Sequence, residues 1–282
     1  MNNILKFNVF LGLYILLLNP SFSQYENSYE FISLSDDINQ TTISSIIKDD
    51  DGMLWLGSSG DGVFKYNSLD FKNYKKETTN NEKSLNSSFI HTLLKDKNNN
   101  IWAGTQEGLN VYDRELDIFN SVVFKENGDK LKFAVHAIRE INDSTLIVGT
   151  HQSGLLKLNK NNYEFDRIKF NSDNSISNLL INSIVKTHET KFIVGTNQGL
   201  MSFDPYNNIL QTAKFDLNTR YETIKSSIES ILIDKNKTIW LGTTSNGIIK
   251  ISTINDTYTI KNIPITNKRI LSLSIKQNGN LL

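Results

Sequence analysis

The chain contains no cysteine among its 282 residues. Disulfides, zinc sites with thiolate ligands and thiol catalysis are therefore excluded. Only 3 prolines occur, so its many turns must rely on glycine, asparagine and aspartate. Neither sign of charge is in excess, because 30 basic and 30 acidic residues give a formal net charge of +0. Without a basic surplus there is no electrostatic basis for nucleic acid binding by this segment.

Long hydrophobic runs are missing after the first 23 residues, and those residues resemble an export signal. Lys6 supplies a positive charge, and residues 9–18 form a short apolar stretch. Residues 21–23 then offer the small-x-small pattern of a cleavage site before Gln24. The apolar stretch is shorter than the roughly 20 residues that span a bilayer. We therefore expect a signal peptide over 1–23 and an exported chain, with an uncleaved anchor as the alternative.

What the chain does have is internal repetition. Each repeat begins with an apolar, strand-like run such as ISSIIK and continues through a polar turn. A short strand ending in x-x-Gly-Ser/Thr follows, then a second turn with glycine and another strand such as VFKY. No segment shows the i, i+3, i+4, i+7 spacing of an amphipathic helix, which excludes helical solenoids. The aligned segments are 43–62, 90–108, 135–154, 181–199 and 228–247.

One glycine, which ends the second strand of each repeat, sets the register. We call it the marker glycine; it recurs in steps of 47, 45, 46 and 47 residues, at Gly57, Gly104, Gly149, Gly195 and Gly242. The chain's 3 tryptophans all lie two residues before it, at Trp55, Trp102 and Trp240. One more strand-like piece precedes each following repeat, as in FKNY and FDRIKF. Four short strands in about 46 residues match the blade of a β-propeller.

The two ends of the chain predict an incomplete ring. Residues 29–34 (YEFISL) resemble the fourth strand of a repeat, which a closed propeller uses to complete its last blade. The last residues, 270–282, match 228–240, so that Leu282 stands where Trp240 stands in the fifth repeat. We therefore expect an all-β fold over 24–282 with five full antiparallel blades and part of a sixth. The ring is expected to be open because the sequence is a fragment of a longer polypeptide.

The motif D-x-x-G-x-[IL]-W-[LA]-G-[ST]-x-x-G-[LV], as in DDDGMLWLGSSGDGVFKY and DKNNNIWAGTQEGLNVYD, resembles the two-component regulator propeller repeat. The resemblance covers residues 29–282. Two repeats depart from it, with Ile147 and Ile193 where tryptophan is usual. A large aliphatic side chain can still fill the space between blades, so we expect those blades to form.

The resemblance implies a layout and a role. Members of the family carry a signal peptide, tandem seven-bladed propellers, a β-sandwich domain, one membrane helix and a cytoplasmic histidine kinase. Many sense polysaccharide breakdown products in Bacteroidetes-type bacteria. We therefore expect a non-catalytic, periplasmic ligand-sensing segment of a hybrid sensor kinase that acts in a phosphorelay and is anchored in the inner membrane. Its expected partners are a glycan and the rest of its own polypeptide, with a second copy as a further candidate, and no cofactor is expected.

Candidate ligand residues come from one face of the propeller. The turns between the second and third strands share this face with the connections into the first strands, and their amide and hydroxyl groups suit sugar hydroxyls. Simple polar turns would have the same composition. The candidates in these turns are Asp61, Gln106, Glu107, His151, Gln152, Asn197, Gln198 and Asn246.

The second residue of each first strand is polar in every repeat, although its neighbours are apolar. A ring of polar side chains at the mouth of the central channel would explain this pattern, and side chains that merely face channel water would explain it equally. A metal pair at the two histidines is conceivable, but no third ligand has a fitting spacing. These residues are Ser44, His91, His136, Asn182 and Glu229.

Two further features have structural and functional interpretations. The turn at 49–52 (DDDG) could hold calcium, but the equivalent turns lack carboxylates, which favours a hairpin turn closed by its aspartate. The tryptophans could stack on sugars, but their fixed place in a strand favours packing between blades.

Two other classes of function remain open. An enzyme, such as a propeller lyase or hydrolase at the channel mouth, would need convergent acids, bases or a metal. Glu107 and Glu229 are the notable candidates on the expected face. A protein-interaction scaffold would need no such groups.

Overall fold

The structure is a computed structural model, which divides into two units, Met1–Gln40 and Thr41–Leu282. The predicted signal peptide and the expected closing strand at 29–34 lie outside the described residues. Among the described residues, no helix is long and apolar enough to cross a membrane. The structure describes residues 41–79, 83–170, 179–187, 191–217, 221–254, 257–263, 265–266, 268–276 and 281.

Five antiparallel sheets follow one another along Thr41–Leu282, and each is numbered here as a blade. Blade 1 contains β1 (Ile43–Lys48), β2 (Leu54–Ser58), β3 (Val63–Tyr66) and β4 (Phe71–Tyr74). Blade 2 contains β5 (Ile90–Lys95), β6 (Ile101–Thr105), β7 (Gly108–Asp113) and β8 (Ile118–Val122). Blade 3 contains β11 (Val135–Asn142), β12 (Thr145–Thr150), β13 (Leu155–Asn159) and β14 (Phe165–Arg167). Blade 4 contains β16 (Ile181–Lys186), β17 (Phe192–Thr196), β18 (Gly199–Asp204) and β19 (Ile209–Thr212), and blade 5 contains β22 (Ile228–Ile233), β23 (Ile239–Thr243), β24 (Ile248–Ile254) and β25 (Thr257–Ile263).

Three short additions interrupt the four-strand pattern. Hairpins β9–β10 (Phe124–Glu126 and Asp129–Leu131) and β20–β21 (Phe215–Asp216 and Tyr221–Glu222) lie in the connections after blades 2 and 4. The segment 165–170, expected as one fourth strand, is divided. Its first half is β14, whereas β15 (Lys169–Phe170) pairs in parallel with β19 and becomes the outer strand of blade 4.

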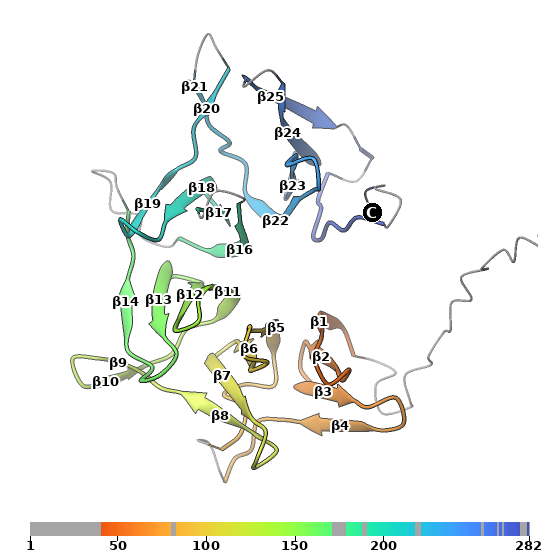
Figure 1. The fold of residues 1–282 in the computed structure, drawn as a ribbon, viewed down its shortest axis with the longest axis vertical. Helices are drawn as coiled ribbons and strands as arrows, with labels where there is room; N and C mark the ends of the chain where they lie inside the picture. The colour runs from red at the N-terminus through yellow and green to blue at the C-terminus, as the bar shows by residue number, and fades with distance from the viewer. Residues whose placement is uncertain are drawn as a thin grey trace, which may run out of the picture. The chain divides into compact units, whose positions relative to one another are not determined.

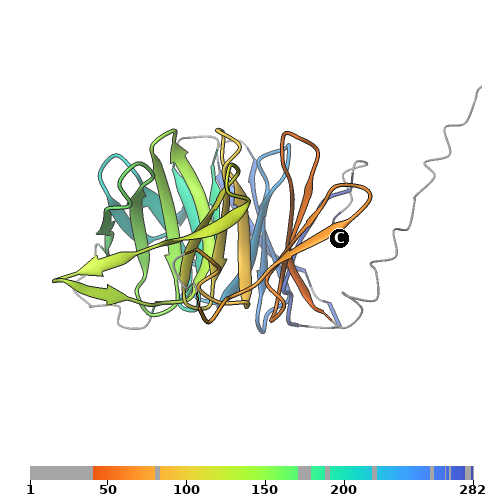
Figure 2. The same cartoon turned by 90° about the horizontal axis from the view of Figure 1, so that it is seen from below.

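The blades are arranged around a common centre with their first strands innermost (Figure 1). Consecutive inner strands contact each other, in the order β1, β5, β11, β16 and β22. Figure 2 shows the same molecule from the side, and there the inner strands run parallel to the central axis that Figure 1 shows end-on. This is the architecture of a β-propeller, as the repeat predicted.

The marker glycine is required because the next blade rests on it. A Cβ atom on Gly149 would lie 2.4 Å from Cγ2 of Ile181, the first residue of the next inner strand. Ile90 and Ile228 approach Gly57 and Gly195 in the same way, each at 2.7 Å. Only glycine lets an inner strand come this close to the second strand of the preceding blade.

The serine or threonine after the marker glycine is fully buried in every repeat. Its hydroxyl donates a hydrogen bond to the carbonyl of the second repeat glycine, as from Thr105 to Gly108 at 3.0 Å and from Thr196 to Gly199 at 2.8 Å. The bond closes the turn between the second and third strands. Gly199 has φ +118°, a backbone conformation that side-chain-bearing residues rarely adopt. The x-x-Gly-Ser/Thr pattern thus encodes both the blade contact and the turn.

Each tryptophan is held by an aspartate six residues earlier. Nε1 of Trp102 donates to Oδ2 of Asp96 at 3.0 Å, while Oδ1 of Asp96 accepts two backbone N–H groups of the turn. Asp96 is 1% exposed. The same bond joins Trp55 to Asp49 and Trp240 to Asp234.

A basic residue of the following blade completes two of these pairs. Nζ of Lys160 lies 3.0 Å from Asp96 and 2.7 Å from Glu140, and Arg114 approaches Asp49 to 3.5 Å. Arg114 and Lys160 occupy the same repeat position, directly after the third strand. Where the tryptophan is replaced, at Ile147 and Ile193, the aspartate is replaced too, by Ile141 and Thr187. These two blades nevertheless form, as expected, and Ile147 is fully buried.

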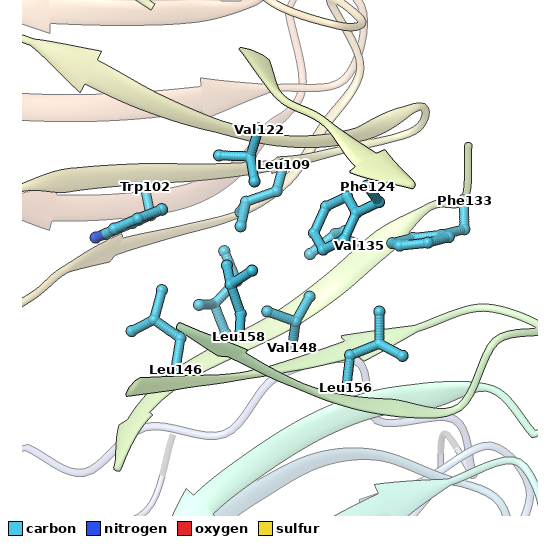
Figure 3. Close-up of a cluster of buried hydrophobic side chains, with 11 residues drawn as sticks. Trp102, Leu109, Val122, Phe124, Phe133, Val135, Leu146, Val148, Leu156 and Leu158 are labelled. Carbon is cyan, nitrogen blue, oxygen red and sulfur yellow. The ribbon is translucent and has the colours of Figure 1, made fainter. Parts of the chain in front are cut away.

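The apolar core lies between blades and not inside any one of them. Between blades 2 and 3, Trp102 and Leu109 pack against a row of aliphatic side chains from the next sheet (Figure 3). Trp55 similarly packs edge-on against Tyr112 of blade 2, with ring centroids 4.6 Å apart. For Trp55 and Trp102 the prediction of packing between blades is therefore confirmed. In the cluster between blades 2 and 3, the side chains that blade 3 contributes are Val135, Ile138, Leu146, Val148, Leu156 and Leu158.

The segment expected to begin a sixth repeat is described in part. The backbone N–H of Ile270 donates to Thr243 at 2.9 Å. A Cβ atom on Gly242 would lie 2.8 Å from Cγ2 of Ile270. Ile270 therefore occupies the place that Ile90 and Ile228 take on the earlier marker glycines.

Candidate functional site

The turns and inner-strand starts selected from the sequence lie on one face of the propeller. The residue that follows each second strand bonds, through its backbone N–H, to the residue before the inner strand of the same blade. Examples are Gln106 to Phe89 at 3.0 Å and His151 to Ala134 at 3.0 Å. We call this face, where the inner strands begin, the channel mouth.

A β-bulge lies at the second residue of every inner strand. The pairing register shifts there between Ile90 and Thr92, and again between Val135 and Ala137. A bulge turns its extra residue out of the regular alternation. This explains why the position can be polar between apolar neighbours. The bulged residues are Ser44, His91, His136, Asn182 and Glu229.

Three histidines form a continuous stack at the channel mouth, here called the imidazole stack. The rings of His91 and His136 are 3.8 Å apart between centroids and inclined by 18°. His136 and His151 are 3.5 Å apart and inclined by 8°. Nε2 of His91 donates to Oε1 of Gln106 at 2.8 Å. Two bulge residues and two turn residues of the predicted site are thus brought into one cluster.

The imidazole stack is uncharged near neutral pH. Burial, together with repulsion from His91 and His151, lowers the pKa of His136 to about 3. Burial also lowers the pKa of His91 and that of His151. Neutral imidazoles each carry one donor and one acceptor nitrogen, which suits hydroxyl-bearing ligands. Nε2 of His151 is buried without a hydrogen-bond partner in the part of the chain that the structure describes. Among the described residues, no three His, Asp or Glu side chains are placed so that they could hold a metal ion.

Two other bulge residues join neighbouring blades. Oγ of Ser44 donates to the carbonyl of Ile90 at 2.6 Å, and Nδ2 of Asn182 donates to that of Ile228 at 2.9 Å. Each acceptor is the first residue of the next inner strand. The position therefore also serves as a link between blades, which the sequence analysis did not foresee. Glu229, the fifth bulge residue, lies 4.0 Å from Arg269.

Two of the remaining turn candidates form ion pairs with lysines away from the imidazole stack. Glu107 is paired with Lys76 at 3.1 Å and with Lys132 at 2.8 Å, and these partners lower its pKa against the opposing effect of burial. Asp61 accepts a hydrogen bond from Thr41 and pairs with Lys75.

The other turn residues mainly shape the backbone. Oδ1 of Asn197 accepts the N–H of Leu180, and Nδ2 of Asn246 donates to Ser226. Gln152 and Gln198 are both exposed, and the backbone of Gln152 has φ +70°. These side chains surround the mouth without converging on one point.

The turn at 49–52 is a hairpin turn closed by its aspartate. Oδ1 of Asp49 accepts the N–H groups of Asp51 and Met53, at 3.0 and 2.9 Å, and Oδ2 accepts the indole of Trp55. Both oxygens of Asp49 are thus engaged within the turn, while Asp50 pairs with Lys95 and Asp51 with Arg114. The predicted hairpin turn, closed by its aspartate, is therefore present.

Two residues were missed by the sequence analysis, Phe89 at the mouth and Arg139 farther along β11. Phe89, directly before β5, is 53% exposed and lies beside Gly60 and Gln106. Arg139 is the fifth residue of β11, where the other inner strands have Ile47, Leu94, Val185 and Leu232. In both cases the available signal was a departure from the repeat. Phe89 is an aromatic residue directly before an inner strand, and Arg139 is a charged residue at a repeat position that is otherwise apolar.

Comparison with known proteins agrees with this architecture. Residues 37–60 and 84–107 match the family model described as two component regulator propeller. Histidine kinase P4 of Formosa agariphila is 28% identical, over 56% of this chain and 15% of that protein. The chain thus spans under a sixth of the kinase's length.

Solved structures show the same fold. The extracellular domain of the hybrid two component system BT4673 from B. thetaiotaomicron superposes with a TM-score of 0.57 at 21% identity, covering 89% of this chain and 38% of that one. Virginiamycin B lyase from Staphylococcus aureus, solved with quinupristin, gives 0.63 at 13% identity, covering 89% and 80%. Sensor and enzyme propellers both resemble the chain, so the fold alone does not decide the function.

Proposed function

Since the chain carries two-component regulator propeller repeats, we propose that it is the extracytoplasmic ligand-sensing part of a sensor histidine kinase. Its channel mouth would bind an oligosaccharide without transforming it. The rest of the polypeptide, with a membrane helix and a kinase, would carry the signal inward. A second copy of the chain is a further candidate partner.

The observation that carries this proposal is the convergence of His91, Gln106, His136 and His151 on one face. Neutral imidazoles and an amide offer both donors and acceptors, which sugar hydroxyls require. The exposed ring of Phe89 adds an apolar surface against which a sugar face can pack. The histidine kinase relative and the sensor propeller of similar fold support the same interpretation.

The links made by Ser44 and Asn182 offer a route from binding to signalling. Each ties a mouth residue to the backbone of the next blade. A ligand that prefers one arrangement of the blades would shift the population toward it. The proposal requires such differential affinity, whatever the output domain.

A screen of the chain against an array of neutral and acidic oligosaccharides, followed by calorimetry, tests this function. Gln106→Ala and His136→Ala should each weaken binding by about tenfold, the loss expected for one or two hydrogen bonds. Asp143→Ala, on the exposed turn between β11 and β12, is the matched control and should bind like the native chain. Turnover of the bound sugar would indicate an enzyme, and recovery of a protein partner without sugar binding would indicate a scaffold.

A further inference from the structure

The inner strand of blade 3 carries a cation where the other blades are apolar. Arg139 is the fifth residue of β11, between Ala137 and Ile141 on the same face of the strand. Both neighbours contribute to the apolar cluster between blades 3 and 4. At the same position, Ile47 and Val185 pack into the corresponding clusters of their own blades.

The guanidinium of Arg139 has no carboxylate partner among the described residues. Within the described part of the chain, its one hydrogen bond runs from Nη1 to the carbonyl of Ile138, at 2.7 Å. The flanking strand β12 (TLIVGT) and the facing inner strand β16 (INSIVK) contain no acidic residue. The side chain is half-buried, and burial lowers the pKa of Arg139 with no opposing contribution from a neighbouring charge.

A half-buried cation of this kind is costly to the fold. Removing a charge from water is unfavourable unless an opposite charge or a full set of hydrogen bonds compensates it. One carbonyl satisfies one of the five N–H groups of an arginine. An aliphatic side chain, as in the other four repeats, would fill the position without this cost.

We propose that Arg139 is the charge partner of an anionic group on the ligand, so that the propeller selects acidic over neutral saccharides. The inference rests on the proposed function and adds the ligand's charge. Arg139 lies three residues along β11 from His136, about 10 Å at the usual rise of a strand. A short oligosaccharide can contact the imidazole stack with its hydroxyls and Arg139 with an oxyanion. The planar guanidinium binds carboxylates and sulfate esters alike, through paired hydrogen bonds.

Calorimetry with glucuronic acid, glucose 6-sulfate and glucose, and with oligomers that contain them, distinguishes the two oxyanions from the neutral sugar. The native chain should bind one or both acidic sugars at least tenfold more tightly than glucose. Arg139→Leu should lose this preference and bind all three equally. Arg139→Lys should keep part of it, because the charge remains while the paired geometry is lost. Arg167→Leu, which removes an exposed arginine paired with Glu126, should keep the preference in full.

Thermal unfolding distinguishes this role from a purely structural one. If Arg139 merely stabilised the fold, its replacement would lower the unfolding midpoint. Arg139→Leu should raise the unfolding midpoint, because an uncompensated cation is replaced by an apolar side chain. A lower midpoint, or an unchanged preference for acidic sugars in this variant, would overturn the inference. Equal binding of all three sugars by the native chain would overturn it while leaving the proposed function intact. Binding of no saccharide at all would reject both.

Discussion

Nζ of Lys160 lies 3.0 Å from Oδ2 of Asp96, and this contact ties blade 3 to the tryptophan turn of blade 2. Asp96 also accepts the indole N–H of Trp102, so one carboxylate serves both sides of the interface. Burial alone would raise the pKa of Asp96, but hydrogen bonds from Trp102, Asn100 and Lys160 lower it. The carboxylate is therefore charged under ordinary conditions, as its buried cation requires.

Asp96→Ala should destabilise the chain by about 3–5 kcal/mol, because it leaves the ammonium of Lys160 and the indole N–H of Trp102 buried without their partner. Urea unfolding followed by tryptophan fluorescence measures the loss. The control is Asp143→Ala, since Asp143 pairs with Lys97 on the exposed surface and should contribute about 0–1 kcal/mol. If the two variants cost the same, the link between blades is not what stabilises this interface.

Replacing both members of the pair provides a second test. In Asp96→Asn with Lys160→Met, both charges of this pair disappear, and Glu140 loses its partner no more than in Lys160→Met alone. The double variant should therefore be more stable than the sum of the single losses predicts. A coupling of about 1–3 kcal/mol is expected for groups in direct contact. Additive losses would mean that Lys160 acts through Glu140 alone.

Gly149→Ala should cost about 2–4 kcal/mol, because the new methyl group would overlap Ile181 of the next blade and overpack the interface. Ile181→Ala alone should also destabilise the chain, because it leaves a cavity between the two blades. In the Ile181→Ala background the added methyl should cost less, because its contact with Cγ2 at 2.4 Å is gone while that with Cβ at 2.9 Å remains. The three variants can be compared by denaturant unfolding. An equal cost of Gly149→Ala in both backgrounds would show that the strain lies in the strand itself.

Acid should destabilise the channel mouth before it protonates most carboxylates. The pKa of His136 is about 3 in the folded chain and about 6.5 when unfolded, so the unfolded state binds the proton more readily. The stability that comes from neutral His136 is complete above pH 6.5 and is lost as the pH falls toward 3. Between pH 6.5 and 4.5 the loss should be about 1–2 kcal/mol, after allowance for partial solvent exposure.

His136→Gln should flatten this part of the pH profile, because glutamine does not titrate. Unfolding free energies measured in urea at several pH values give the comparison, with the variant and the native chain side by side. Parallel profiles would show that the imidazole stack does not contribute to acid sensitivity.

Asn110→Leu should destabilise by about 2 kcal/mol or more, although leucine or a similar residue is found at this position in other blades. The amide of Asn110 donates to the carbonyls of Ser84 and Asn120 and accepts the N–H of Asn86. Asn110 is fully buried, so leucine would leave these groups without partners. Met201→Leu, the equivalent change in blade 4, is the control and should cost less than about 1.5 kcal/mol. Hydrogen exchange at residues 84–89 should rise only in the first variant.

The repeat itself was readable from the sequence because its physical causes are local. The marker glycine, the serine or threonine after it and the alternating strands each appear in every unit. The link between Trp102 and Asp96 was also present in the sequence as a six-residue spacing, since both members are missing together in blades 3 and 4. It went unnoticed because an aspartate in a turn already has a sufficient local explanation.

The remaining features depend on contacts between units. The equivalent repeat positions of His91 and His136 place them on adjacent blades, but do not reveal that their rings stack or that His151 joins them. Residues 165–170 have one continuous strand pattern, which cannot show that Lys169 pairs with the edge of the next blade. Which candidates converge is likewise a matter of blade geometry. The sequence analysis therefore placed the candidates on one face and His91 beside His136, but found neither the full cluster nor Arg139.

The parallel pairing of Lys169 with Ile209 determines where the chain can be shortened. The stretch that leaves blade 3 covers the outer edge of blade 4 before the chain enters that blade. A version beginning after Phe170 would uncover β19 and present its free backbone groups to other molecules, which favours aggregation. A version beginning at Ile168 keeps that edge protected, so studies of the later blades alone should start there.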